Sequence, residues 1–160
     1  MIYAACQKAH CTASECKAQK GGHCIGRTAG GLDSKLHAVC DGNRRSVRIA
    51  LTEGQRSDDD SAHLLLVDFP VAKQLLADKT YDTDWFGDTL AKRKISACIP
   101  ARAKCSHPAI HDVRLHKQRH KSEHVRALER VETCRYARYD RCAHTFFSAL
   151  YSAATGIFWL

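Results

Sequence analysis

Two alternating segments joined by a short turn restrict the fold of this chain more than any other feature of its sequence. Polar and apolar residues alternate over residues 35–40 and again over residues 46–52. Alternation with a period of two is typical of strands that bury one face, and Asp41-Gly42-Asn43 between the segments is a strong hairpin-turn signal. The sequence therefore predicts two antiparallel strands joined as a hairpin.

Helix and strand signals alternate after the hairpin. Ser57 is followed by three aspartates, which is typical of an N-cap with acids in the first helical turn, and a helix should run from there to near Pro70. Residues 74–78 and 95–99 predict short strands, and residues 82–94 predict a helix between them. This order favours the α/β class, with a mixed sheet flanked by helices.

Asp78 ends the predicted strand over residues 74–78 and lies just before a helix. A carboxylate at the C-terminal end of a buried strand is where α/β folds place chemistry. The alternative is that Asp78 only caps a turn or the next helix. This stretch by itself leaves both interpretations open.

The remainder of the chain predicts a loop and two further helices. The glycines of residues 21–31 predict a flexible loop. Residues 113–135 predict a long charged helix, and residues 145–160 predict an apolar closing helix. The last is shorter than the roughly 20 residues that cross a bilayer, and no signal peptide is evident, so we expect a cytoplasmic protein with no membrane partner. The 160 residues suit one domain, residues 1–160.

Charge and cysteine content narrow the class of partner. The net charge of +8 argues for a polyanion, with nucleic acid as the first candidate and an anionic membrane surface as the second. Nine cysteines, an odd number without an export signal, argue against a disulfide framework. Cysteines and histidines crowd residues 6–24, so a zinc site is an alternative, although the cluster lacks regular ligand pairs.

Functional side chains share one stripe of the predicted long helix. His116, Arg119, Glu123 and Arg130 fall at i, i+3, i+7 and i+14. One interpretation is that Glu123 forms a salt bridge with Arg119 and has no further role. Alternatively, Glu123 and Asp78 converge on a hard cation such as Mg²⁺ (or Mn²⁺), with neighbouring bases holding phosphates.

A second set on this helix suggests a different metal. His116, His120 and His124 share a face at i, i+4 and i+8, a spacing that can bind zinc. The glutamate of an HExxH motif is missing and the surroundings are strongly basic, so partial positive charge toward phosphates is the favoured interpretation.

Several motifs resemble those of bacterial insertion-sequence transposases of the DDE class. Residues 26–39 (GRTAGGLDSKLHAV) are similar to a GR-x-x-GG-x-x-(T/S)-K-(L/I)-HA-V segment, and residues 76–84 (LADKTYDTD) to the segment around the second catalytic aspartate. Residues 139–147 and 158–160 resemble the family's C-terminal end. The helix stripe resembles Y-x₂-R-x₃-E-x₆-K, with His116 and Arg130 replacing the tyrosine and the lysine.

The resemblance covers essentially the whole chain and implies a ribonuclease-H-like domain with an apolar C-terminal helix. It implies metal-dependent DNA cleavage and strand transfer, with Asp78 and Glu123 as catalytic metal ligands for Mg²⁺ (or Mn²⁺). Arg119, Arg130, Lys117 and His116 would contact double-stranded DNA at transposon ends and target. A homodimer on DNA and a nucleoid-associated place in a bacterial cytoplasm also fit the family.

The position of the first catalytic acid also departs from the family pattern. Residues 1–10 (MIYAACQKAH) are similar to the opening segment M-I-D-A-T-H-x-K-A-H, and Tyr3 stands where its first catalytic aspartate is expected. A neutral phenol with a pKa near 10 cannot replace a bridging carboxylate. We also expect a truncated first strand and the absence of the usual N-terminal DNA-binding region.

The sequence thus predicts a transposase whose activity is lost or impaired. Asp41, Asp82 and Asp84 could be considered as replacements for the missing aspartate, but a hairpin turn explains Asp41 better and helix capping explains Asp82 better. The alternatives are a non-catalytic DNA-binding remnant or regulator of transposition, and a zinc-dependent module.

Overall fold

The computed structural model describes residues 1–8, 24–43, 45–67, 69–102, 112–117 and 143–160. Strands and helices are both present in these ranges, so the α/β class is confirmed. None of the helices in the described part combines the length and the apolarity needed to cross a membrane.

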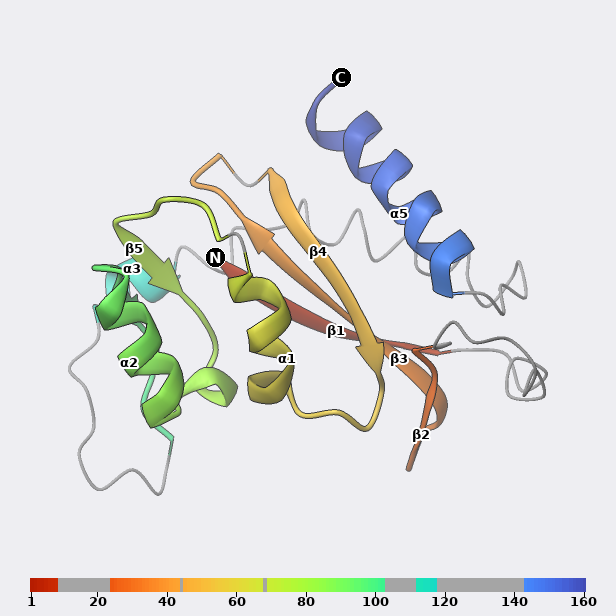
Figure 1. Cartoon of the computed structure of the whole chain (residues 1–160), viewed down its shortest axis with the longest axis horizontal. Coiled ribbons are helices and arrows are strands. Elements are labelled where there is room, and N and C mark those ends of the chain that lie inside the picture. Colours follow the sequence, from red (N-terminus) through yellow and green to blue (C-terminus); the bar gives the residue numbers. More distant parts are fainter. Residues whose placement is uncertain (9–23, 44, 68, 103–111, 118–142) are drawn as a thin grey trace.

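The longest strand, β3 (Gly31–Cys40), organises the first sheet. Strand β1 (Ile2–Lys8) pairs antiparallel with it along one side, with Ile2 opposite Val39. Strand β4 (Ser46–Glu53) pairs antiparallel along the other side, which confirms the predicted hairpin (Figure 1). In the turn, the Asp41 carboxylate accepts from the Arg45 backbone N–H at 2.8 Å, so Asp41 serves the turn as predicted.

The prediction of a flexible loop over residues 21–31 is wrong for residues 26–28, which form a strand. Residues Gly26–Thr28 form strand β2, which pairs antiparallel with the beginning of β3. A tight turn joins the two strands because Gly31 has a φ of 115°, a conformation that glycine adopts without steric cost. The Gly30 N–H donates to the Thr28 hydroxyl at 3.1 Å, so these glycines build a turn.

Residues 58–98 form helix–strand units beside the first sheet. Helix α1 (Asp58–Leu66) begins at Ser57, whose hydroxyl accepts from the Asp60 N–H at 3.4 Å, as the N-cap signal predicted. The elements that follow α1 are, in chain order, β5 (Gln74–Leu76), the short 3₁₀ helix η2 (Lys79–Tyr81), α2 (Asp84–Lys92) and β6 (Ser96–Cys98). Strands β5 and β6 pair in parallel and form a second sheet.

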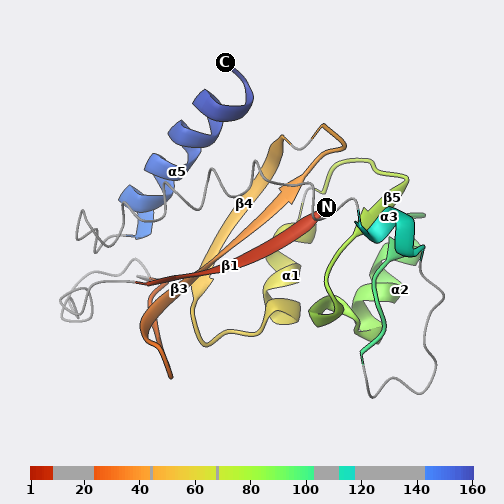
Figure 2. The ribbon, with the colours of Figure 1, turned by 180° about the vertical axis from the view of Figure 1, so that it is seen from behind.

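Helices cover both faces of the first sheet (Figures 1 and 2). On one face, Val39 packs with Leu65 of α1 and with residues of β5 and α2, including Leu75 and Phe86. On the other, Leu36 and Ile49 pack against the apolar helix α5 (Ala143–Phe158), which buries Phe146, Leu150 and Ala154 at successive turns. The predicted apolar closing helix is therefore confirmed.

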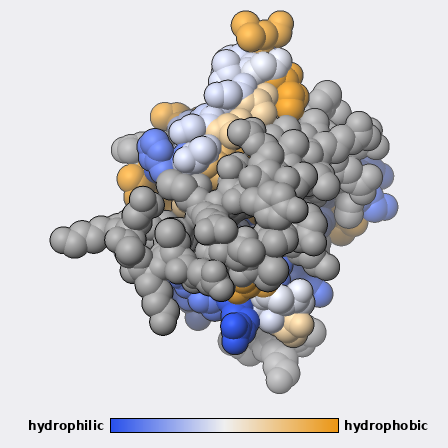
Figure 3. All heavy atoms as spheres, turned by 90° about the vertical axis from the view of Figure 1, so that its right-hand side faces the viewer, coloured by the Kyte–Doolittle hydropathy of each residue, from blue (hydrophilic) through white to orange (hydrophobic). Residues whose placement is uncertain are grey.

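The C-terminal end of α5 also exposes apolar side chains. Ile157 and Trp159 are 42% and 55% exposed, and the Arg45 guanidinium lies 5.1 Å from the centre of the Trp159 ring. Figure 3 shows hydrophobic surface gathered at this end of the molecule. Only one face of helix α5 therefore packs against the sheet.

Candidate functional site

Asp78 lies directly beyond the carboxyl end of β5. Leu75, Leu76 and Ala77 before it are buried, and the chain reaches the surface at Asp78, which is half-buried. Its carboxylate Oδ1 accepts from the Lys79 N–H at 2.7 Å, so Asp78 is the N-cap of η2. The capping role predicted as the alternative is real, and it leaves the side chain at the edge where α/β proteins place chemistry.

A buried aromatic residue fixes the turn after Asp78. Tyr81 is 1% exposed, and its ring lies 5.8 Å from that of Phe86 on α2. The Tyr81 N–H donates to the Asp78 carbonyl at 3.0 Å, which closes the 3₁₀ turn. The position of Asp78 is therefore set by packing on one side and by backbone hydrogen bonds on the other.

The parallel pairing of β5 and β6 brings a second segment to the same edge. The Ala77 N–H donates to the Cys98 carbonyl at 3.5 Å, so the chain leaves both strands side by side. Four residues after β6, Arg102 donates from Nε to the Lys79 carbonyl at 3.1 Å and from Nη2 to the Thr80 carbonyl. The sequence does not distinguish Arg102, because a position in a basic loop carries no signal of this contact.

Asp82 takes part in the same junction; it is the C-cap residue of η2, and its carboxylate does not cap the helix that follows. Its carboxylate Oδ2 accepts from the Arg102 backbone N–H at 2.7 Å. Helix α2 begins two residues later, and its N-cap is Thr83, which makes no side-chain capping bond. Asp82 thus joins the segments that follow β5 and β6.

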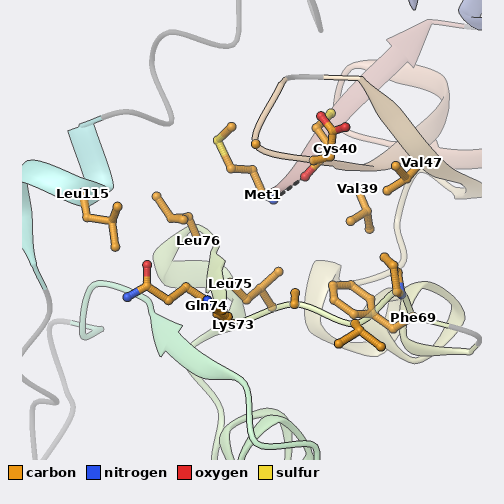
Figure 4. A pocket seen from close by; sticks show the side chains of 15 residues that line it. Met1, Val39, Cys40, Val47, Phe69, Lys73, Gln74, Leu75, Leu76 and Leu115 are labelled. Carbon is orange, nitrogen blue, oxygen red and sulfur yellow. Dashed lines mark hydrogen bonds between the residues drawn. The ribbon is translucent and has the colours of Figure 1, made fainter. Parts of the chain in front are cut away.

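The beginning of the predicted long helix lies next to these strands. Helix α3 (Val113–Lys117) is capped by Asp112, whose carboxylate accepts from the Arg114 N–H at 2.8 Å. The Cys98 thiol of β6 donates to the Asp112 carbonyl at 3.5 Å. Leu115 of α3 lines a pocket together with Leu75 and Leu76 of β5 (Figure 4). The chain therefore enters the region of the predicted helix from beside β5 and β6.

The other predicted site residues are described to different extents. His116 is half-buried and Lys117 is exposed, both at the end of α3. Arg119, Glu123 and Arg130 lie outside the described residues, so the convergence of Glu123 on Asp78 stays a prediction. On β1, the backbone of Tyr3 pairs opposite Ala38 of β3.

The pocket beside β5 has a volume of about 440 Å³ and does not contain Asp78. Its lining is mostly apolar and includes Met1, Val39, Phe69 and Leu115 (Figure 4). The Met1 amino group donates to the Cys40 carbonyl at 2.7 Å, and burial lowers its pKa. Because this lining is mostly apolar and does not include Asp78, the candidate site is the edge at Asp78.

The part of the chain that the structure describes shows no cluster of side chains that would form a zinc site. Within those ranges, no three His, Cys, Asp or Glu side chains gather as metal ligands would. Most of the N-terminal cysteine and histidine cluster lies outside the described residues, as do His120 and His124, so both zinc alternatives stay untested. Cys40 and Cys98 are buried thiols.

The fold and the site define an α/β protein with an acid at the carboxyl edge of a parallel strand pair. Residues 7–149 match the family model described as "Transposase DDE domain". The chain belongs to this transposase family, as its motifs indicated. The matched range contains Asp78 and the position of Glu123, and it begins after Tyr3. Comparison with curated proteins gave no match, and comparison with solved structures gave none either.

Proposed function

We propose that residues 1–160 form the catalytic domain of a DDE transposase with a ribonuclease-H-like fold. Its function would be metal-dependent cleavage and strand transfer of double-stranded DNA at transposon ends and target. The observation that carries the proposal is the placement of Asp78 at the shared carboxyl edge of β5 and β6, inside the matched family range. Helix α3, which leads toward Glu123, begins beside the same strands.

The chemistry of Asp78 fits a divalent metal such as Mg²⁺ or Mn²⁺. Its carboxylate supplies oxygen donors of the kind that these hard cations prefer, and Asp78 is only half-buried at this edge. The chemistry that bound ions supply in such sites is activation of an attacking oxygen at a phosphodiester. Asp78 and Glu123 would hold the metal.

The basic residues of the long helix would bind the DNA. Arg119 and Arg130 would position phosphates near the cut, with Lys117 and His116 beside them. Lys117 is exposed at the end of α3, which supports this role. The proposal places the protein on the nucleoid of a bacterial cytoplasm and includes a homodimer on DNA.

Because Tyr3 stands at the position of the first catalytic aspartate, we infer that this copy is inactive or impaired. A phenol with a pKa near 10 cannot supply the missing carboxylate at neutral pH. The structure gives Asp41 and Asp82 local roles of their own, since Asp41 accepts from the Arg45 N–H in the hairpin turn and Asp82 accepts from the Arg102 N–H. The second candidate function follows from the same observation: a non-catalytic DNA-binding remnant or regulator that uses its +8 charge.

Nicking of a DNA end in Mg²⁺ tests the proposal. We expect little nicking by the chain as it stands, a gain on Tyr3→Asp, and loss of that gain when Asp78→Asn is added. Arg119→Ala should weaken salt-sensitive DNA binding, measured by fluorescence anisotropy. DNA binding without nicking in any of these variants would favour the regulator, whereas robust nicking by the unchanged chain would contradict the role given to Tyr3.

A further inference from the structure

One arginine, Arg102, forms hydrogen bonds with the turn that follows Asp78. Arg102 lies in the segment after β6 and donates three hydrogen bonds to the segment after β5. Its Nε donates to the Lys79 carbonyl at 3.1 Å, its Nη2 donates to the Thr80 carbonyl, and its backbone N–H donates to the Asp82 carboxylate at 2.7 Å. One residue therefore contacts three of the four residues from 79 to 82.

The contact with Lys79 connects Arg102 directly to the carboxylate of Asp78. The Lys79 N–H donates to Asp78 Oδ1 at 2.7 Å, and the Lys79 carbonyl accepts from Arg102 Nε at 3.1 Å. The same residue is thus held by Asp78 at its amide and by Arg102 at its carbonyl. A shift of the Lys79 backbone would move the N–H that donates to the Asp78 carboxylate.

The guanidinium group is suited to this role in shape and in charge. Its planar fork presents donors in a fixed geometry, which matches the two successive carbonyls of η2. These carbonyls belong to the first two residues of η2, and hydrogen bonds from a charged donor are stronger than those from a neutral one. A lysine at this position offers a compact ammonium on a flexible chain, which does not reproduce the fork.

Burial does not explain the contact. Arg102 is exposed, and the hydrophobic core of this region is formed by other residues, among them Leu75, Tyr81 and Phe86. Another arginine makes a similar contact away from Asp78, since Arg93 Nη1 donates to the Leu66 carbonyl at 2.7 Å at the end of α1. Arg93 therefore offers a matched control for the loss of an arginine–carbonyl bond.

We propose that Arg102 is a positioning residue that holds the Asp78 carboxylate in its metal-binding orientation. The inference rests on the proposed function, in which Asp78 binds a divalent ion. Arg102 itself contacts neither metal nor DNA in this role. It acts through the Lys79 peptide and fixes the junction between the segments after β5 and β6.

Binding of Mn²⁺ to the full chain, measured from the electron paramagnetic resonance signal of the free ion, tests the inference. We expect Asp78→Asn to abolish binding and Arg102→Gln to raise the dissociation constant about ten-fold, as loss of residues that orient a metal ligand does. Arg102→Lys should recover part of the affinity, and it serves as the readout if Arg102→Gln does not fold. Arg93→Gln should leave the dissociation constant unchanged.

The outcomes separate the two claims. Loss of binding in Asp78→Asn together with unchanged affinity in both Arg102 variants overturns the positioning role and leaves the proposed function standing. Unchanged Mn²⁺ binding in Asp78→Asn, or no binding by the native chain, overturns the proposed metal site and the inference with it. A purely structural role for Arg102 would lower the thermal unfolding temperature without changing the Mn²⁺ affinity, and that result also refutes the inference.

Discussion

Acidification should destabilise this fold through His37, a histidine in the interior of the first sheet. His37 is 0% exposed on β3, and one ring nitrogen, Nε2, lies 2.9 Å from the Thr52 hydroxyl. Burial lowers its pKa from 6.5 to about 4, the nearby Asp58 carboxylate opposes this, and the charges of Lys35 and Arg56 add to the lowering. The imidazole is therefore neutral in the folded protein at pH 5 and above.

The pKa difference sets the size of the effect. Between pH 6.5 and 4 the unfolded chain binds a proton at this position that the folded protein does not, so stability falls as the pH falls. The lowering from 6.5 to about 4 amounts to about 3 kcal/mol, at about 1.4 kcal/mol per pKa unit. About 2 kcal/mol of this should be lost by pH 5, and the full contribution should be present above pH 6.5.

Urea unfolding at pH 7 and pH 5 measures this loss. The substitution His37→Gln removes the titrating group, so the difference in unfolding free energy between the two pH values should shrink by about 2 kcal/mol. The variant His63→Gln, which changes an exposed histidine on α1, should keep the native difference. A His37→Gln protein that loses as much stability on acidification as the native chain would refute this reasoning.

Three further predictions concern packing and thiol chemistry. Phe146→Ala, at a site 2% exposed between α5 and the sheet, should cost about 3–5 kcal/mol in urea unfolding, and a loss below about 1 kcal/mol would contradict the packing of α5. Gly54→Ala would place a methyl group 2.7 Å from a backbone oxygen of β3 and should cost about 1–3 kcal/mol, whereas Gly42→Ala meets nothing within 4 Å and should be nearly neutral in the same assay. Burial raises the pKa of the Cys40 thiol to about 11, so peptide mapping after alkylation at pH 8 should find exposed Cys6 labelled and Cys40 unlabelled until the protein is unfolded.

Elements with local signals could be predicted from the sequence. The hairpin of β3 and β4 follows from alternation and an Asp-Gly-Asn turn, and its register is maintained by bonds within that turn. The start of α1 follows from Ser57, and the buried face of α5 follows from apolar residues at successive turns. In each case the residues that determine the element lie within a few positions of one another.

Features that depend on distant pairing could not be predicted. Strand β2 is only three residues long, and its pairing with β3 is hidden by glycines that suggest a loop. Arg102 is one of eleven Lys and Arg residues among residues 91–130, and nothing in the sequence distinguishes it from the others. Its contacts with residues 79–82 exist because parallel pairing of β5 and β6 brings the two segments together. Asp78 could be predicted as a site residue because the family motif surrounds it, whereas the structure supplied the residue that holds its turn.

The docking of α5 on β4 has a consequence for synthesis of the chain. The Tyr151 hydroxyl donates to the Ile49 carbonyl at 3.4 Å, a contact between residues 102 positions apart. At about 5–20 residues per second, a ribosome needs about 5–20 s to add that length. During this interval Leu36 and Ile49 have been made, and the helix that covers them has not. A ribosome that terminates or changes frame before Ala143 therefore releases a product with an open apolar sheet face, which chaperones and proteases recognise.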